Sequence, residues 1–208
     1  AIDASDAIFV ARQNFKESEN ALFLKCDLLK PPLKDGVVDV GYCIGVLHHV
    51  TDPIKGFLQI IRTIKTGGQF ALSVYENSLF DRPDRNSVFV AFKDVLWTLN
   101  VLRAEVFRFV GSRLPSSLML KYCVYVVPVL YQLNKVPVLR AARYLFPSTC
   151  YRHLPVEWSM CDTMDTYATK VVHQYRAKTI FHWFRQANFV EISLLNSRAG
   201  WVSVTGKK

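Results

Sequence analysis

Over the first 75 residues, short continuous apolar runs alternate with stretches whose apolar positions have helical spacing. Three of the runs have the length and composition of strands: residues 21–26, 37–44 and 69–75. Between them, the spacing predicts one helix over residues 5–16 and a second that begins at Pro53, where a first helical residue tolerates proline. We expect Gly67 and Gly68 to end the second helix, because glycine readily takes a positive φ.

Strands that are apolar at nearly every position, alternating with helices, favour a parallel sheet covered on both faces. The pattern changes over residues 79–160, where helical runs are too long to be a simple connection. Residues 178–187 have the pattern of another amphipathic helix, and residues 189–195 and 201–206 those of two strands of an antiparallel hairpin. We therefore predict an α/β fold with a mostly parallel sheet, a C-terminal antiparallel hairpin and a helical insertion.

The composition is that of a folded protein, since 50% of the 208 residues are hydrophobic. A formal net charge of +9 predicts a basic surface, but no Arg/Gly-rich tract occurs, so nucleic acid is not an expected partner. Five scattered cysteines without CxxC spacing are typical of a reducing compartment, which favours the cytoplasm. The most apolar run, residues 118–133, contains Lys121 and Pro128 and is shorter than the roughly 20 residues of a spanning helix. We expect a soluble protein.

Four segments in order carry a resemblance: AIDAS, FLKCDLLKPPLKDGVVDVGYCIGVLHHVTDP, IIRTIKTGGQFALSVYE and FHWFRQANFVEI. Together they resemble class I S-adenosylmethionine-dependent methyltransferases, more narrowly the group with the ubiquinone/menaquinone-type and small-molecule methyltransferases. The similarity covers residues 1–76 and 162–206, and the helical insertion only loosely. It implies a Rossmann-like cofactor-binding part over residues 1–78 and 161–208, a helical cap over residues 79–160, and S-adenosylmethionine as the cofactor.

The resemblance assigns cofactor contacts to the ends of three strands. Asp3 matches the acidic residue that binds the ribose hydroxyls, and Asp27 with Leu28 matches the pair that meets the adenine. The segment that faces the methionine part of the cofactor matches Cys43, Ile44 and Gly45. A ligand of an open α/β sheet lies outside the carboxyl ends of the strands, so this convergence is physically sensible. Taken singly, Asp3 or Asp27 is equally well explained as a cap of the following helix or turn.

Some positions depart from the family pattern. The glycine-rich loop after the family's first strand is missing, because the sequence begins after it. We therefore expect an N-terminally truncated domain that lacks half of the cofactor site, and an inactive fragment is one of the expected outcomes. Thr66 replaces a usual proline, and Val38 replaces a common phenylalanine. Asn188 replaces a usual glycine at a helix end, where Asn is the next-best residue for the left-handed conformation.

Two adjacent histidines, His48 and His49, stand where the strand over residues 37–44 passes into the next helix. In some relatives that form O-methyl products, a histidine here acts as general base, a role that suits an imidazole of pKa about 6.5. The alternative is structural, with hydrogen bonds from one or both rings to the turn. Glu76, at a strand end, is a candidate for holding an acceptor hydroxyl and equally for capping a loop. Adjacent side chains on a strand point to opposite faces, so we expect no metal site.

The predicted cap is basic and aromatic. Residues 85–157 contain ten Lys or Arg and three Asp or Glu. The aromatic residues of the cap include Phe89, Phe92, Trp97, Tyr122, Tyr125, Tyr131 and Tyr144. This composition favours a cover over an apolar or anionic small-molecule acceptor, and peripheral contact with a membrane is a further option. Alternatively, the aromatic side chains form a core and the arginines form a solvated face.

We therefore predict methyl transfer from S-adenosylmethionine to an oxygen or carbon of a small-molecule acceptor. The transfer is an in-line displacement at an activated sulfonium, so positioning and exclusion of water are the protein's main tasks. One alternative is a non-catalytic methyltransferase-like module that binds a partner through its basic helical cap. Another is a nicotinamide-dependent enzyme, against which the sequence shows no glycine fingerprint. The acceptor and the oligomeric state stay open.

Overall fold

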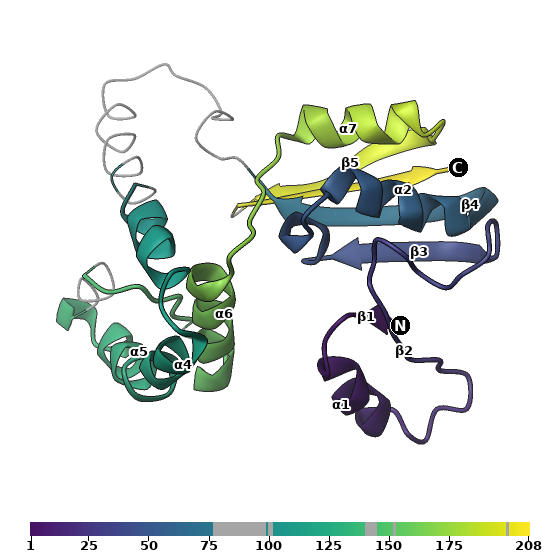
Figure 1. Ribbon diagram of the computed structural model, residues 1–208. Coiled ribbons are helices and arrows are strands. Elements are labelled where there is room, and N and C mark those ends of the chain that lie inside the picture. Colours follow the sequence, from purple (N-terminus) through teal and green to yellow (C-terminus); the bar gives the residue numbers. More distant parts are fainter. Residues whose placement is uncertain (77–98, 100–101, 140–144, 152, 199) are drawn as a thin grey trace, which may run out of the picture. The chain divides into compact units, whose positions relative to one another are not determined.

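A computed structural model describes residues 1–76, 99, 102–139, 145–151, 153–198 and 200–208 (Figure 1). The chain divides into a sheet unit and a helical unit, which comprise Ala1–Asp81 with Val171–Lys208 and Arg82–Lys170, respectively. Four aromatic residues of the predicted cap lie outside the described residues: Phe89, Phe92, Trp97 and Tyr144.

The sheet unit contains six strands in its described residues: β1 (Ile2–Asp3), β2 (Leu24–Lys25), β3 (Val38–Ile44), β4 (Ile64–Tyr75), β5 (Val190–Arg198) and β6 (Trp201–Lys207). β1 and β2 pair in parallel, and the other four form a sheet of order β3-β4-β6-β5. In that sheet β3 and β4 are parallel, whereas β6 is antiparallel to both neighbours. The predicted α/β fold with a C-terminal antiparallel hairpin is therefore confirmed.

Helices α2 and α7 cover one face of the four-stranded sheet (Figure 1). The helical elements of this unit are α1 (Ala7–Asn14), the 3₁₀ turn η1 (Leu47–His49), α2 (Pro53–Thr63) and α7 (Ala177–Gln186). As expected, α2 begins at Pro53, and the side chain of Asp52 caps it by accepting a hydrogen bond from the Lys55 N–H at 3.0 Å. Asn188, just after α7, has φ 60°, as its place at a helix end predicts.

The core lies between these two helices and the sheet. Alternate residues of β4, including Phe70, Leu72 and Val74, pack there with Phe57 of α2 and Phe184 of α7. The prediction of a sheet covered on both faces is wrong for β3. On the face opposite the core, its apolar side chains Val40, Tyr42 and Ile44 are exposed.

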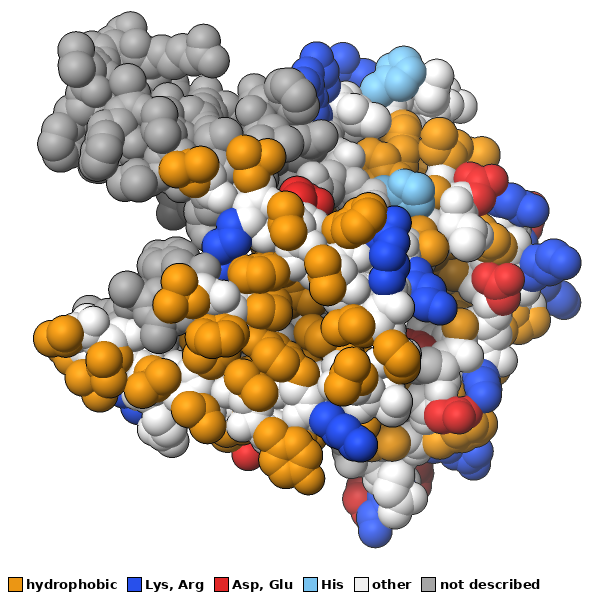
Figure 2. Space-filling model, turned by 60° about the vertical axis from the view of Figure 1, so that its left-hand side comes forward, with side chains coloured by type: hydrophobic (Ala, Val, Ile, Leu, Met, Phe, Trp, Pro, Cys, Tyr) orange, Lys and Arg blue, Asp and Glu red, His pale blue; other side chains and the backbone are white. Residues whose placement is uncertain are grey.

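The described helices of the helical unit comprise residues 102–111, α4 (Ser116–Tyr125), α5 (Val127–Lys135) and α6 (Val156–Ala168). A small core joins α4 and α5 to α6 through Met119, Cys123, Val127 and Tyr167. A Cβ on Gly111 would collide with the Tyr167 carbonyl, so glycine allows the close approach of the first helix to α6. The unit extends to Lys170 rather than to residue 160, because α6 is one continuous helix that packs on α4 and α5. One face of this unit carries many apolar side chains (Figure 2).

The predicted end of α2 at Gly67 and Gly68 is wrong. The helix ends at Thr63, and β4 begins at the next residue. Gly67, with φ 81°, lies inside β4, and a Cβ on Gly68 would lie 2.8 Å from the carbonyl oxygen of Asp39 in β3. The two glycines therefore serve the pairing of β3 with β4 and not the helix terminus.

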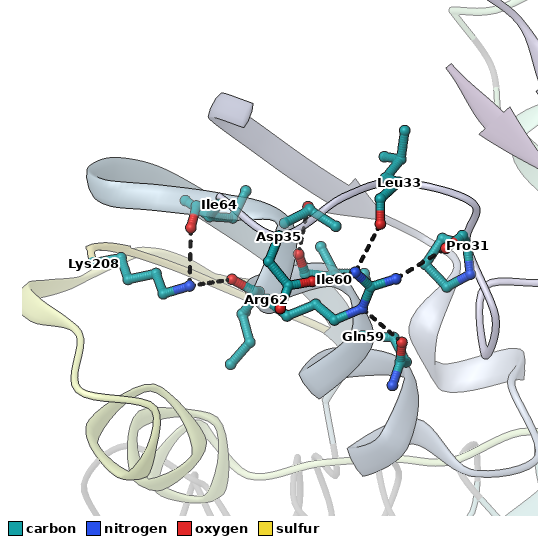
Figure 3. A network of polar contacts seen from close by, with 10 residues as sticks. Pro31, Leu33, Asp35, Gln59, Ile60, Arg62, Ile64 and Lys208 are labelled. Carbon is teal, nitrogen blue, oxygen red and sulfur yellow. Dashed lines mark hydrogen bonds and ion pairs between the residues drawn. The ribbon is translucent and has the colours of Figure 1, made fainter. Parts of the chain in front are cut away.

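Two cationic side chains fix the end of α2 (Figure 3). Arg62 donates to the carbonyl oxygens of Leu33 at 2.7 Å and Pro31 at 2.9 Å, and it forms an ion pair with Asp35. The C-terminal Lys208 donates from Nζ to the carbonyl oxygens at the helix end, those of Ile61 at 2.7 Å and Ile64 at 2.9 Å. The two Lys208 bonds satisfy carbonyl groups that a helix end leaves without partners, and the Arg62 bonds tie the last turn of α2 to the loop before β3. They explain why the chain turns from helix to strand without a glycine.

Candidate functional site

A cavity of about 350 Å³ lies in the sheet unit beyond the carboxyl ends of β1, β2 and β3. Its volume is at the low end of the roughly 300–1,000 Å³ that is usual for small-molecule sites. The residues that line it include Ile2, Asp3, Asp27, Leu28, Val46 and His49. Three of the residues predicted for a cofactor site, Asp3, Asp27 and Leu28, thus share one cavity with one of the two histidines.

Parallel pairing of β1 with β2 brings the two carboxylates to the same edge. The Cys26 N–H donates to the carbonyl oxygen of Asp3 at 3.0 Å, which extends the ladder to the residue before Asp27. In each residue, Oδ1 stabilises the turn that follows. Oδ1 of Asp3 accepts a hydrogen bond from the Ser5 N–H at 2.7 Å, and Oδ1 of Asp27 accepts one from the Leu29 N–H at 2.8 Å. Among the described hydrogen bonds, none reaches either Oδ2. Each carboxylate therefore caps a turn with one oxygen and keeps the other as an acceptor.

The remaining walls of the cavity are mostly apolar. Leu28 is half-buried and packs against the core, and Ile2, Val46 and Val50 add aliphatic surface. Aliphatic walls suit a flat heterocycle, while carboxylate oxygens accept hydrogen bonds from hydroxyl and amino groups. The residues present therefore fit a nucleoside, which combines a flat base with an exocyclic amine and a vicinal diol.

Cys43, Ile44 and Gly45 do not line this cavity in the structure. The Cys43 side chain is 7% exposed and belongs to the core, where burial raises the pKa of its thiol to about 11. Ile44 is 62% exposed on the other face of β3. Gly45 has φ 74°, and its N–H donates to the carbonyl oxygen of Ser73 at 3.1 Å. A role for these three residues toward a cofactor would involve their backbone, and it stays a prediction.

The two histidines have different surroundings. The His48 side chain is fully buried, with its ring 3.9 Å from that of Tyr75 and 5.6 Å from that of Trp201. Its carbonyl oxygen accepts a hydrogen bond from the His173 N–H at 2.8 Å, which fastens residues 171–175 to the end of β3. These contacts favour the structural interpretation of His48.

His49 is half-buried and lines the cavity. Its Nδ1 lies 3.0 Å from the carbonyl oxygen of Val171. A carbonyl oxygen only accepts, so this bond requires the proton on Nδ1, and in the neutral ring the lone pair is then on Nε2. The Val171 bond thus fixes the tautomer of a neutral His49, while Nε2 itself is buried in the structure, so the role of general base stays a prediction.

Glu76 is 9% exposed and does not line the cavity. Its N–H donates to the carbonyl oxygen of Gly200 at 2.8 Å, and it forms a parallel bridge with Tyr175. The aromatic ring of Trp201 was not predicted as a site residue, although it packs 4.7 Å from Tyr75 beside the histidines. Its position follows from the register of β4 with β6, in which Trp201 lies opposite Tyr75. The described part of the chain contains no cluster of three or more His, Cys, Asp or Glu side chains that would hold a metal ion.

Comparisons with known proteins find similarity in sequence over the first third of the chain. Residues 1–72 match the family model of a methyltransferase domain. Over 65 residues the chain is 35% identical to cycloartenol-C-24-methyltransferase 1 of Oryza sativa subsp. japonica, an alignment that covers 31% of this chain and 18% of that protein. The chain therefore matches less than a fifth of the length of that relative.

Solved structures with low sequence identity are also similar to this chain. A possible exported protein from Bordetella parapertussis has a TM-score of 0.50 and 13% identity, with 100% of this chain and 52% of that chain covered. A possible histamine N-methyltransferase from Thermotoga maritima, described as S-adenosylmethionine-dependent, has a TM-score of 0.47 and 14% identity, with 100% and 72% covered. Residues 1–72 are thus similar to a methyltransferase domain, and this match supports S-adenosylmethionine as the cofactor.

Proposed function

We propose that this chain transfers a methyl group from S-adenosylmethionine to an oxygen or carbon atom of a small-molecule acceptor. The observation that carries the proposal is the cavity beyond the ends of β1, β2 and β3, which Asp3, Asp27 and His49 share. The match of residues 1–72 to a methyltransferase domain supports it independently. The narrower assignment to the ubiquinone/menaquinone-type group rests on the sequence resemblance alone.

Each side chain has a distinct task in this proposal. Oδ2 of Asp3 accepts hydrogen bonds from the ribose hydroxyls, and Asp27 accepts one from the exocyclic amine of the base. Leu28 packs against the base. S-adenosylmethionine, when bound, would supply a methyl group on a sulfonium, from which the neutral thioether S-adenosylhomocysteine leaves as the bond to the acceptor forms. The protein therefore needs to position the acceptor and to exclude water.

His49 takes the role of general base when the acceptor atom is a hydroxyl oxygen. With Nδ1 donating to the Val171 carbonyl, Nε2 is the atom that takes the hydroxyl proton as the methyl group transfers. Nε2 is buried in the structure, so this role requires that binding of the acceptor expose it. His48 and Glu76, which lie outside the cavity lining, have no part in this step. The Oryza relative is named as a C-24-methyltransferase of cycloartenol, and this name supports the inclusion of carbon among the acceptor atoms.

Methyl-labelled S-adenosylmethionine and a panel of phenols, aliphatic alcohols and alkenes test this function. We expect label in an extracted product of at least one acceptor class. With a hydroxyl acceptor, we expect His49→Gln to lower kcat by roughly a hundredfold to ten-thousandfold. The variant should also lose the rise of kcat with pH that deprotonation of the base causes, while its affinity for S-adenosylhomocysteine stays unchanged.

Two outcomes would favour other functions. Binding of S-adenosylhomocysteine without transfer to any acceptor would support the non-catalytic module. Binding of NAD⁺ instead would support the nicotinamide-dependent enzyme. A Tyr-x-x-x-Lys spacing does occur at Tyr131 and Lys135, but Tyr131 Oη donates to the carbonyl oxygen of Leu154 at 2.8 Å inside the helical unit. That contact gives Tyr131 a structural role.

A further inference from the structure

The helical unit exposes a broad apolar face (Figure 2). The stretch Ser116–Lys135, which contains α4 and α5, has the length and hydropathy of a membrane-crossing helix. Only 28% of its most apolar window is buried. The core helix of a soluble domain would be mostly buried. Exposed side chains on α4 and α5 include Leu118 at 49%, Tyr125 at 72% and Val129 at 57%.

These helices are apolar on both sides. Met119, Cys123 and Val127 point inward and pack with Tyr167 of α6, so the core of the unit is already formed. The exposed side chains are therefore additional to the core. An apolar surface of this extent on a folded unit marks an interaction site.

The apolar face contains a cavity of about 520 Å³ between residues 107–114 and α4. Leu114 and Leu118 are among its lining residues, and Lys121 also lines it. A cavity with such walls accepts hydrocarbon and offers few hydrogen-bond partners to a polar ligand. The surface is thus both apolar and hollowed.

The charges on the helices that form this face are mostly positive, whereas α6 of the same unit carries Glu157, Asp162 and Asp165. The described residues 102–139 contain five basic residues and one acidic residue. The acidic residue, Glu105, forms an ion pair with Arg108 of the same helix. Lys121 follows the apolar residue Leu120 on α4, and Arg113 covers the ring of Phe109, with its guanidinium carbon 3.4 Å from the ring centroid. Long cationic side chains among exposed apolar groups suit the boundary between acyl chains and anionic headgroups.

We propose that this face, which we call the docking face, binds the surface of a membrane that contains anionic lipids. Its apolar side chains enter the boundary of the acyl region, and Lys121 and Arg113 meet the headgroups. A second copy of the chain is a poorer occupant, because it would bring the same positive charges to the contact. Crossing of the membrane is disfavoured, because Lys121 interrupts the apolar surface of α4 and Asn134 is buried at 1% exposure against the rest of the unit.

Vesicle co-sedimentation of the full chain tests this proposal. We expect binding to vesicles of mixed phosphatidylcholine and phosphatidylglycerol, weaker binding to pure phosphatidylcholine, and loss of binding as salt rises. The double variant Leu118→Ser with Tyr125→Ser should lower the affinity for the mixed vesicles by roughly tenfold or more. Lys121→Glu with Arg113→Glu should abolish the preference for the anionic vesicles.

The control removes two exposed apolar side chains of the sheet unit, Ile54 and Leu58 of α2, by the same change to Ser. It should bind vesicles like the unchanged chain, and circular dichroism should show all variants folded. Equal binding by the Leu118/Tyr125 variant, or no binding to any vesicle by the unchanged chain, would overturn the proposal. So would a dimer in sedimentation velocity that the same variant dissociates, or capture of a monomeric fatty acid without vesicle binding.

Discussion

At the residue scale, the two carboxylate oxygens of Asp3 have different roles, and so do those of Asp27. Oδ1 of each holds the turn two residues on, and Oδ2 is the oxygen that we assign to a ligand. This division distinguishes substitution by Asn from substitution by Ala. An amide oxygen preserves the turn, whereas the amide nitrogen donates and does not accept.

We expect Asp27→Asn to weaken S-adenosylhomocysteine binding roughly tenfold to a hundredfold, the effect of losing a charge-assisted hydrogen bond. Its thermal unfolding should match that of the unchanged chain, because the amide oxygen still accepts from Leu29. Asp27→Ala should lose both affinity and stability. Titration calorimetry and thermal melts check the pair of variants, and an unchanged affinity in both would remove Asp27 from the site.

The cysteines allow a second prediction. The thiolate is the reactive form, so burial that raises the pKa of Cys43 to about 11 leaves its thiolate fraction roughly a hundredfold lower than usual at neutral pH. Cys161 is exposed. Under native, mildly alkaline conditions iodoacetamide should therefore modify Cys161 first and Cys43 only after unfolding. Peptide mass spectrometry reads the order, and equally fast alkylation of Cys43 would contradict its place in the core.

Some of these residue positions were predictable from the sequence and some were not. Asp27 follows an apolar run, and a polar residue there is expected at the carboxyl end of a strand. The inward direction of Cys43 was not predictable, because β3 is apolar on both faces and its pattern does not show which face is covered. Because His48 and His49 are adjacent, different surroundings for the two rings were predictable. The hydrogen-bond partner of His49 was not, because Val171 lies 122 residues away in the sequence.

At the element scale, Arg62 joins the last turn of α2 to the loop before β3. We expect Arg62→Ala to lower the free energy of unfolding by about 1–3 kcal/mol, since it leaves carbonyl groups of Pro31 and Leu33 without their donor. Denaturant unfolding measures the change.

Asp35→Asn is the matched control for Arg62. It removes only an ion pair whose Asp side chain is 77% exposed, so we expect a loss of about 1 kcal/mol or less. If Asp35→Asn destabilised the chain as much as Arg62→Ala, the ion pair rather than the carbonyl contacts would hold this junction.

The same junction shows why one element boundary was mispredicted. Paired glycines after an amphipathic run usually end a helix. Here the donor at the helix end is instead Nζ of Lys208, the last residue of the sequence, which bonds to the carbonyl oxygens of Ile61 and Ile64. Such a long-range partner leaves no local signal. The start of α2 at Pro53 was predictable, because its signal is local.

At the scale of the whole molecule, the candidate cofactor site and the docking face lie in different units. The sheet unit carries the carboxylates and His49 around a cavity, and the helical unit carries the apolar, basic docking face. The helical character of residues 102–135 was predictable from apolar spacing, but the course of α6 to Ala168, beyond the predicted end of the insertion at residue 160, was not. Its exposed apolar face was not, because the sequence pattern alone does not distinguish a core aromatic from an exposed one, as Tyr131 at 8% and Tyr125 at 72% exposure show.

Calorimetric titration of S-adenosylhomocysteine into the full chain, beside a titration of NAD⁺, tests the central claim most directly. We predict saturable one-to-one binding of S-adenosylhomocysteine, weakened by Asp3→Asn and by Asp27→Asn, and no binding of NAD⁺. Absence of saturable heat with S-adenosylhomocysteine, or an affinity that both substitutions leave unchanged, would contradict a cofactor site beyond the ends of β1 and β2.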